Sequence, residues 1–117
     1  MKTKRGQVVR VLFPNSNLRT AKRRPALVIQ SDQLQTGLAQ TIVAMITSNL
    51  ANAYQLSRVL VTASSAEGKQ AGLRLDSVIM SDNLATILET EIDSVLGTLP
   101  AHKMLEVATA LRHTLEL

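Results

Sequence analysis

Two separate stretches of this chain carry residue types that could act together on a phosphate. Arg24 precedes the aliphatic run 26–29, and a second aliphatic run, 41–46, ends at Thr47. An arginine guanidinium donates several hydrogen bonds in one plane, and a threonine hydroxyl can donate one more. Pro25 biases Arg24 toward an extended backbone. If the two runs pair as strands, a positive charge would lie beside a hydroxyl, and that combination favours phosphate binding.

The residues that other kinds of chemistry require are missing or badly spaced. The chain has no cysteine, which excludes disulfides, thiolate metal sites and cysteine nucleophiles, and which fits a reducing cytoplasm. His102 and His113 do not have the i, i+4 spacing of a helical metal site, and we expect them to lie on a helix surface. The carboxylates form no motif-like pair, and there is no glycine-rich phosphate loop. We therefore expect neither a metal ion nor another cofactor.

The basic residues are concentrated at the start of the chain. Residues 1–31 hold eight lysines and arginines and no acid, whereas the remainder holds five basic and nine acidic residues. The first segment therefore has a net charge of +8 and the rest −4. Such an imbalance indicates an anionic partner, such as a nucleic acid or an acidic chain. The alternative is a solvated surface without a partner.

The elements that would position these residues are mostly strands. The runs 26–30 and 41–47 are almost continuously aliphatic, as expected for strands buried on both faces. Because Phe13 and Tyr54 are the only aromatic residues, the core must consist of aliphatic side chains. Further strands are expected at 7–13, 57–62, 76–80, 84–88 and 94–99, with loops at 14–22 and 63–72, a helical turn within 31–37 and a short helix at 90–93.

The chain is expected to end in an amphipathic helix that starts near Pro100. The apolar residues that recur with helical spacing on one face are Met104, Leu105, Ala108, Leu111 and Leu115. A length of 117 residues suits one hydrophobic core, and we expect a single domain over 1–117. No segment has the apolar length of a signal-peptide core or a membrane span, so we expect no membrane association.

Four parts of the chain, taken in order, resemble the MazF/PemK family of toxin endoribonucleases. They are 7–14 with 23–29, then 44–50, then 76–87, and finally 97–100 with the helix that follows. Each part alone is a weak signal, but together they cover nearly the whole chain in register. The resemblance implies an α+β fold, mostly antiparallel β, in which a compact SH3-like barrel of the MazF/PemK/CcdB type carries a C-terminal amphipathic helix.

The resemblance also implies a function. It indicates the toxin of a type II toxin–antitoxin system, acting in the cytoplasm as a homodimer and cleaving single-stranded RNA without a metal. The second expected partner is an acidic antitoxin encoded beside it. Arg24 and Thr47 match the arginine and threonine that the family uses at the scissile phosphate. The residues expected to bind RNA around them are Arg19, Lys22, Arg23, Ser48, Asn49 and Asp82.

Some positions depart from the family pattern. Many members carry an arginine where this chain has Ala85, and others carry one where it has Met80. Arg19, Arg23 or Arg74 could replace that missing cation. The helix that follows the third similar segment is also shortened or absent in this chain.

The chemistry expected of this site needs few protein groups. RNA carries its own nucleophile, the 2′-hydroxyl, so an enzyme has to align the reacting atoms and stabilise charge on the phosphoryl oxygens. Arg24 suits the second task because it stays protonated near neutral pH. Without the family resemblance, the simpler interpretation is that Arg24 pairs with a carboxylate such as Asp82 and that Thr47 is an ordinary strand residue.

Two rival functions belong to other classes. One is a non-catalytic SH3-like module that binds RNA or protein, which Ala85 at the place of a frequent arginine favours. The other is a gyrase-inhibiting toxin of the same fold. Those toxins resemble each other in a C-terminal end with tryptophan, and this chain contains none.

Overall fold

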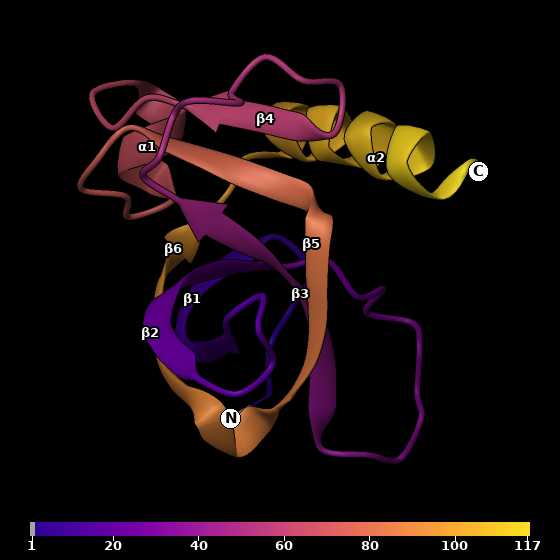
Figure 1. Ribbon diagram of the computed structural model, residues 1–117. Helices are drawn as coiled ribbons and strands as arrows, with labels where there is room; N and C mark the ends of the chain where they lie inside the picture. Colours follow the sequence, from indigo (N-terminus) through magenta and orange to yellow (C-terminus); the bar gives the residue numbers. More distant parts are fainter. Residues whose placement is uncertain (1) are drawn as a thin grey trace.

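The computed structural model describes residues 2–117 and is built on a curled antiparallel sheet (Figure 1). The sheet has six strands in the order β4-β5-β3-β2-β1-β6. The strands are β1 Gln7–Pro14, β2 Ala21–Val28, β3 Gln40–Thr47, β4 Arg58–Val61, β5 Ser77–Leu88 and β6 Ile92–Thr98. The helices are α1 Ala66–Gln70, the 3-10 helix η1 Glu89–Glu91 and α2 Ala101–Leu115.

The predicted α+β fold is confirmed, with one difference in the sheet. The edge strands of the described sheet, β4 and β6, do not pair with each other, so hydrogen bonding does not close the barrel. The short helix expected at 90–93 is present as η1, shifted by one residue at its start. No helix of the described chain is both long and apolar enough to cross a membrane.

The ladder between β3 and β5 is interrupted at one point. Ala44 pairs with Leu84, but the next residue, Met45, pairs with Met80, so residues 81–83 have no partner on β3. Extra residues in one strand bend it and redirect its side chains. Figure 1 shows this bend in the long orange strand. The two strands predicted at 76–80 and 84–88 are therefore one bent strand.

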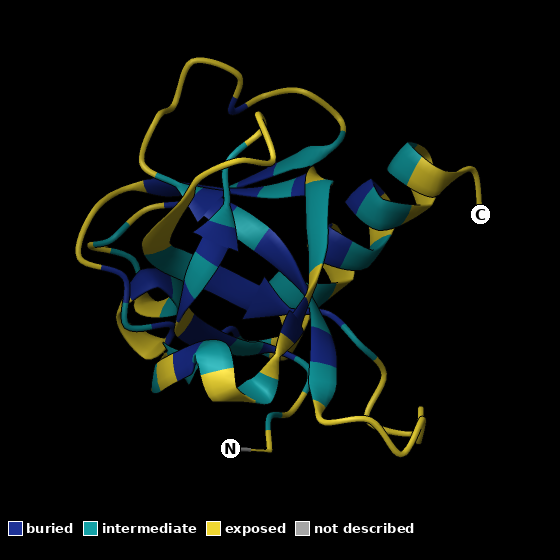
Figure 2. Ribbon diagram, turned by 60° about the horizontal axis from the view of Figure 1, so that its bottom comes forward, coloured by how far each residue is buried: buried dark blue, intermediate teal, exposed yellow. Residues whose placement is uncertain are grey.

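Buried residues are found along most strands of the sheet (Figure 2). Their aliphatic side chains form one cluster on each face. Consecutive residues such as Val8 and Val9 belong to different clusters, because successive side chains of a strand point to opposite faces. The cluster covered by α2 includes Leu27, Ala44, Ile46, Ile79 and Val107. The cluster inside the curl includes Phe13, Ala26, Val28, Val43 and Ile92. This two-sided core explains why the runs 26–29 and 41–46 are aliphatic at nearly every position.

The C-terminal helix is present, but its buried face differs from the predicted one. Val107 and Ala110 are its buried residues, whereas Leu105 is 71% exposed. Met104 and Leu111 pack against the same cluster. Both possible stripes have helical spacing, so only contact with β4 and β5 decides which stripe is buried.

Two segments predicted as loops contain regular structure. β2 begins at Ala21, five residues before the predicted start, because a hairpin turn over 15–20 joins it to β1. In that turn, the Asn15 amide donates to the Thr20 carbonyl at 2.8 Å. The predicted loop 63–72 contains α1, whose first turn is capped by the Ser65 hydroxyl accepting from the Gly68 amide at 3.0 Å. The helical turn expected within 31–37 is only a hydrogen-bonded turn, without a helix.

Candidate functional site

Arg24 and Thr47 lie on neighbouring strands near the end where the two strands separate. The β2–β3 ladder ends with Ala26 opposite Met45, next to Pro25, which has no N–H to donate. Two further steps of the same register would place Arg24 opposite Thr47. Both side chains line a hollow of about 560 Å³. The sequence-based expectation that strand pairing brings this arginine beside this threonine agrees with the geometry.

This hollow is lined by polar, mostly uncharged residues, and we call it the asparagine-rich hollow. Its lining residues are Pro14, Asn15, Ser16, Asn17, Arg24, Met45, Thr47, Asn49, Asn52, Arg58, Met80 and Asn83. Two arginines and no carboxylate are among them. The amide groups offer both donors and acceptors, so the hollow suits a ligand with an anionic group and with polar edges, such as a nucleotide.

Arg24 is held in place by neutral partners. Its Nη2 donates to Asn15 Oδ1 at 2.6 Å, and its Nη1 contacts Met45 Sδ at 3.4 Å. No carboxylate of the described residues forms a salt bridge with it. The simpler interpretation, in which Arg24 pairs with Asp82, is therefore wrong. An oriented guanidinium without a counter-ion is well suited to bind an anion.

The hydroxyl of Thr47 is also oriented by its neighbours. Its Oγ1 accepts a hydrogen bond from the Asn49 backbone amide at 3.1 Å. Asn49 Oδ1 in turn accepts from the Ala51 amide at 3.0 Å, which stabilises the turn after β3. Because the hydroxyl oxygen is used as an acceptor, its hydrogen remains free to point elsewhere and can be donated to a ligand.

Sequence reasoning missed Arg58, which lies in the same hollow. Its Nε and Nη2 donate to the two oxygens of Asp82 at 2.9 and 3.1 Å, and its side chain is only 13% exposed. Ser57 Oγ adds a third hydrogen bond to Asp82 at 3.1 Å. One sequence feature pointed to it: Arg58 is the only basic residue between Arg24 and Lys69.

A second depression, which we call the basic groove, adjoins the first. It has a volume of about 660 Å³ and shares Arg24 and Thr47 with the asparagine-rich hollow. Its lining residues are Arg10, Lys22, Arg23, Arg24, Pro25, Ile46, Thr47, Ser48, Gly72, Leu73, Arg74, Leu75, Ser77 and Leu96. Five of them are basic and none is acidic. Its positive charge suits a polyanion that extends past Arg24.

The predicted RNA-binding residues are divided between these two depressions. Lys22, Arg23 and Ser48 line the basic groove, whereas Asn49 lines the asparagine-rich hollow. Arg23 is bound to Asp93 at 2.8 Å, and Arg10 reaches the same carboxylate at 3.6 Å. Arg19 is exposed in the hairpin turn and lines neither depression.

Asp82 also lines neither depression, and its carboxylate is occupied by Arg58 and Ser57. Among the substitutes proposed for the missing arginine, Arg23 and Arg74 line the groove, and none of the three lines the asparagine-rich hollow.

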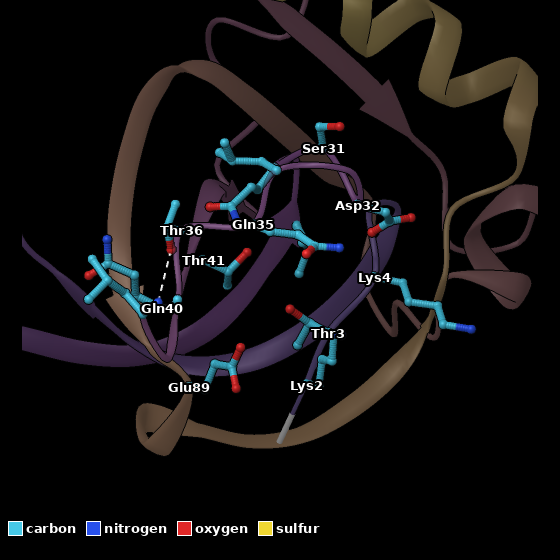
Figure 3. A pocket seen from close by; sticks show the side chains of 15 residues that line it. Lys2, Thr3, Lys4, Ser31, Asp32, Gln35, Thr36, Gln40, Thr41 and Glu89 are labelled. Carbon is cyan, nitrogen blue, oxygen red and sulfur yellow. Dashed lines mark hydrogen bonds between the residues drawn. The ribbon is translucent and has the colours of Figure 1, made fainter.

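A third hollow, of about 670 Å³, lies away from this region (Figure 3). It is bounded by residues 2–4, by the segment that joins β2 to β3, and by Glu89. The charged residues that line it are of both signs, namely Lys2, Lys4, Asp32 and Glu89. None of the predicted site residues lines it. Within residues 2–117, no group of three or more possible metal ligands comes together.

Comparison with known proteins places this geometry in a known family. Residues 4–115 match the family described as "PemK-like, MazF-like toxin of type II toxin-antitoxin system". The chain is 39% identical over 107 residues to Endoribonuclease MazF6 of Mycobacterium tuberculosis and to Endoribonuclease MazF2 of Mycobacterium bovis, covering 91% of this chain and 90% of each relative.

Solved structures share the fold. An endoribonuclease in complex with its cognate antitoxin, from a mycobacterial species, superposes with a TM-score of 0.75 at 21% identity, covering 99% of this chain and 97% of that one. MazF from Deinococcus radiodurans superposes with a TM-score of 0.73 at 22% identity, covering 100% and 99%. Together with the family match over nearly the whole length, these findings show that the chain belongs to the PemK-like, MazF-like toxins of type II toxin–antitoxin systems.

Proposed function

We propose that this chain is the toxin of a type II toxin–antitoxin system and that it cuts single-stranded RNA, with Arg24 and Thr47 at the scissile phosphate. The observation that carries the proposal is the placement of these two residues at the shared border of two depressions, with no carboxylate of residues 2–117 paired to Arg24. Relatives at 39% identity are named endoribonucleases. The names of these relatives favour neither a non-catalytic module nor a gyrase-inhibiting toxin.

The reaction proceeds by attack of the substrate's own 2′-oxygen on the adjacent phosphorus. The bond between phosphorus and the 5′-oxygen breaks, the 2′-hydroxyl loses its proton, and the leaving 5′-oxygen gains one. The products are a 2′,3′-cyclic phosphate and a 5′-hydroxyl. Arg24 stabilises the charge that builds on the phosphoryl oxygens, and the Thr47 hydroxyl donates a further hydrogen bond to them. No step requires a metal ion or an activated water.

The two depressions hold the RNA on either side of that phosphate. The basic groove binds backbone phosphates through Arg23 and Lys22, with Ser48 as a neutral donor, and Arg19 adds charge at the exposed turn. The asparagine-rich hollow accepts a nucleotide whose base edge can exchange hydrogen bonds with side-chain amides such as that of Asn49. Extended single strands suit this arrangement, because unstacked bases can enter the hollow.

The chain works as a homodimer and is neutralised by an antitoxin in the cytoplasm, where its RNA substrate is found. Solved relatives of the same fold include complexes of MazF with MazE and of an endoribonuclease with its cognate antitoxin. The cationic side chains of the basic groove attract an acidic antitoxin segment as well as RNA. An antitoxin bound there blocks access of RNA to Arg24.

The deciding experiment is incubation of the purified protein with a long unstructured RNA in excess EDTA. We expect cleavage that leaves a 2′,3′-cyclic phosphate and a 5′-hydroxyl, and no cleavage where the ribose 5′ of the scissile phosphate is replaced by deoxyribose. Activity that vanishes with EDTA and returns with magnesium would contradict the mechanism. RNA binding without any cutting would instead identify a binding module.

A further inference from the structure

We propose that Arg58 is a second phosphate-binding residue of this site and that Asp82 is the residue that positions it. The inference rests on the proposed function and extends it to residues that the sequence did not connect with it. It also assigns Asp82 a different role from the direct RNA contact predicted above. Its basis is the position of Arg58, the geometry of its bonds to Asp82 and the charges that line the hollow.

Strand pairing places Arg58 on the same face as Arg24. Arg58 is opposite Met80, and Met80 is opposite Met45, so these three side chains form a row across β4, β5 and β3. Met45 then contacts Arg24 through its sulfur. The two arginines therefore line the same hollow from opposite sides, with two methionines between them.

The bonds to Asp82 leave one end of the Arg58 guanidinium available. Nε and Nη2 are used by the carboxylate, and Nη1 has no hydrogen-bond partner among the described residues. A bidentate contact fixes the plane of an arginine, so the direction of the free Nη1 donors is fixed as well. Arg58 lines the hollow, whereas Asp82 does not. A ligand in the hollow therefore meets the guanidinium rather than the carboxylate.

The environment of Asp82 supports a positioning role. It lies in the part of β5 that has no partner on β3, where the strand bends. The bend brings it next to the start of β4, where Arg58 and the preceding residue, Ser57, both donate to it. With three hydrogen bonds in place, its carboxylate holds Arg58 and has little remaining capacity to contact RNA directly. The Arg58 head group is consequently rigid before substrate arrives, which reduces the entropy lost on binding.

The chemical group that this arrangement binds is a phosphate of the RNA backbone. Arg24 and Arg58 lie on opposite sides of one hollow, so a strand that crosses it can contact both. Either the scissile phosphate lies between them or Arg58 binds a phosphate next to it, and in both cases removal of Arg58 removes one phosphate contact. Such a loss is measurable, because each phosphate contact to a single strand contributes about 0.7 to the slope of log affinity against log salt.

The test combines RNA binding and RNA cleavage. Binding is measured from about 50 to about 300 mM salt, a range over which phosphate contacts lose affinity steeply. The oligonucleotide carries a deoxyribose at the cleavage position. Cleavage is measured in a single turnover with the all-ribose oligonucleotide. For Arg58→Met, we expect a rate about 10- to 100-fold lower and a salt slope smaller by about 0.7. Arg112→Met, which removes an exposed charge on α2, serves as the matched control and should change neither quantity.

A double variant separates direct contact from charge neutralisation. Arg58→Met leaves Asp82 without its partner, and an unpaired carboxylate would itself repel RNA. In Arg58→Met/Asp82→Asn, the carboxylate is neutral, and we expect the slow rate and the reduced slope to persist. Recovery of the parental rate in the double variant would overturn the proposal, because Arg58 would then only neutralise Asp82.

Two single variants keep the test decisive if Arg58→Met fails to fold, as judged from its melting curve. Arg58→Lys keeps the charge but loses the bidentate contact with Asp82. We expect it to retain the salt slope of RNA binding and to cleave RNA more slowly. Asp82→Asn should also lower the rate, by less than Arg58→Met. Parental rates in both variants would overturn the proposal. If the parent binds RNA but does not cut it, the proposed function fails. Comparing the salt slopes of the parent and Arg58→Met then still tests whether Arg58 binds a phosphate.

Discussion

Arg24 lines both the asparagine-rich hollow and the basic groove, whereas the adjacent Arg23 lines the groove alone, and the two side chains are held differently. Arg24 is oriented by the neutral groups of Asn15 and Met45. Arg23, the preceding residue, points to the other side of β2 and is bound to Asp93, with 43% of its side chain exposed. Consecutive residues of a strand point to opposite faces. Two adjacent arginines can therefore differ, one having a carboxylate as counter-ion and the other having none.

This difference indicates two separate tasks. A fixed donor without a counter-ion can stabilise charge that develops during a reaction, because no internal ion pair has to be broken first. An exposed cation bound to a carboxylate is screened by solvent and contributes modestly to binding and to the attraction of a polyanion. We therefore expect substitutions of residues that line the hollow, including the shared Arg24 and Thr47, to reduce the rate of cleavage. Substitutions of residues that line the groove alone should change mainly RNA affinity.

Arg24→Ala should have the largest effect. We expect its cleavage rate to fall by about 100- to 10,000-fold while RNA affinity changes much less, because the lost interaction is strongest in the transition state. Arg23→Ala, the neighbouring control, should lose less than about 10-fold in rate. Single-turnover cleavage and binding to a deoxy-substituted oligonucleotide measure the two quantities. Equal losses in the two variants would remove the distinction between hollow and groove.

Thr47→Ala should have the next largest effect. The variant loses one hydrogen bond to the phosphoryl oxygens, and we expect a rate about 10- to 100-fold lower with an unchanged fold. Thr47→Ser retains the hydroxyl and should stay close to the parent. Cleavage rates and circular dichroism spectra of both variants check this expectation, which fails if the alanine variant cuts RNA at the parental rate.

Asp93→Asn should act on the groove alone. Removing this carboxylate frees Arg23 and Arg10 from their shared partner. We expect RNA binding to become about 2- to 5-fold tighter at low salt, and the gain to disappear at high salt, because the effect is electrostatic. The single-turnover rate at saturating protein should not change. A slower chemical step in this variant would show that the groove also takes part in catalysis.

Glu67→Gln should alter neither depression. It should change only how the stability of the folded protein depends on acid pH. Hydrogen bonding, above all with His102 at 2.9 Å, lowers the pKa of Glu67 from 4.5 to about 2. Because the pKa of Glu67 is lower in the folded protein than its ordinary value, its contact with His102 stabilises the fold fully above pH 4.5. This stabilisation is lost as the pH falls toward 2.

The melting temperature of the parent should therefore drop more steeply than that of Glu67→Gln between about pH 5 and pH 2, from just above the ordinary pKa down to the shifted one. RNA cleavage at neutral pH should be the same in both proteins. Parallel melting curves over the acid range would contradict the role of the contact between Glu67 and His102.

Local patterns in the sequence determined much of this protein. The aliphatic runs 26–29 and 41–46 identified the central strands β2 and β3, and the spacing after Pro100 identified α2. The family, the fold class and the endoribonuclease interpretation followed from four ordered segments and are confirmed by the comparisons. These features are predictable because side-chain periodicity and chain order are properties of neighbouring residues.

Only the tertiary structure decided which charged groups meet. Asp82 lies in a bend of β5, and this bend directs it to Arg58, 24 positions earlier in the chain, and away from Arg24. In the same way, the buried stripe of α2 was selected by its contact with the sheet. Such pairings depend on strand register and on how far the sheet curls, and both result from packing between distant segments. Local periodicity does not contain that information, so Arg58 could be connected to the site only after the strands had been placed.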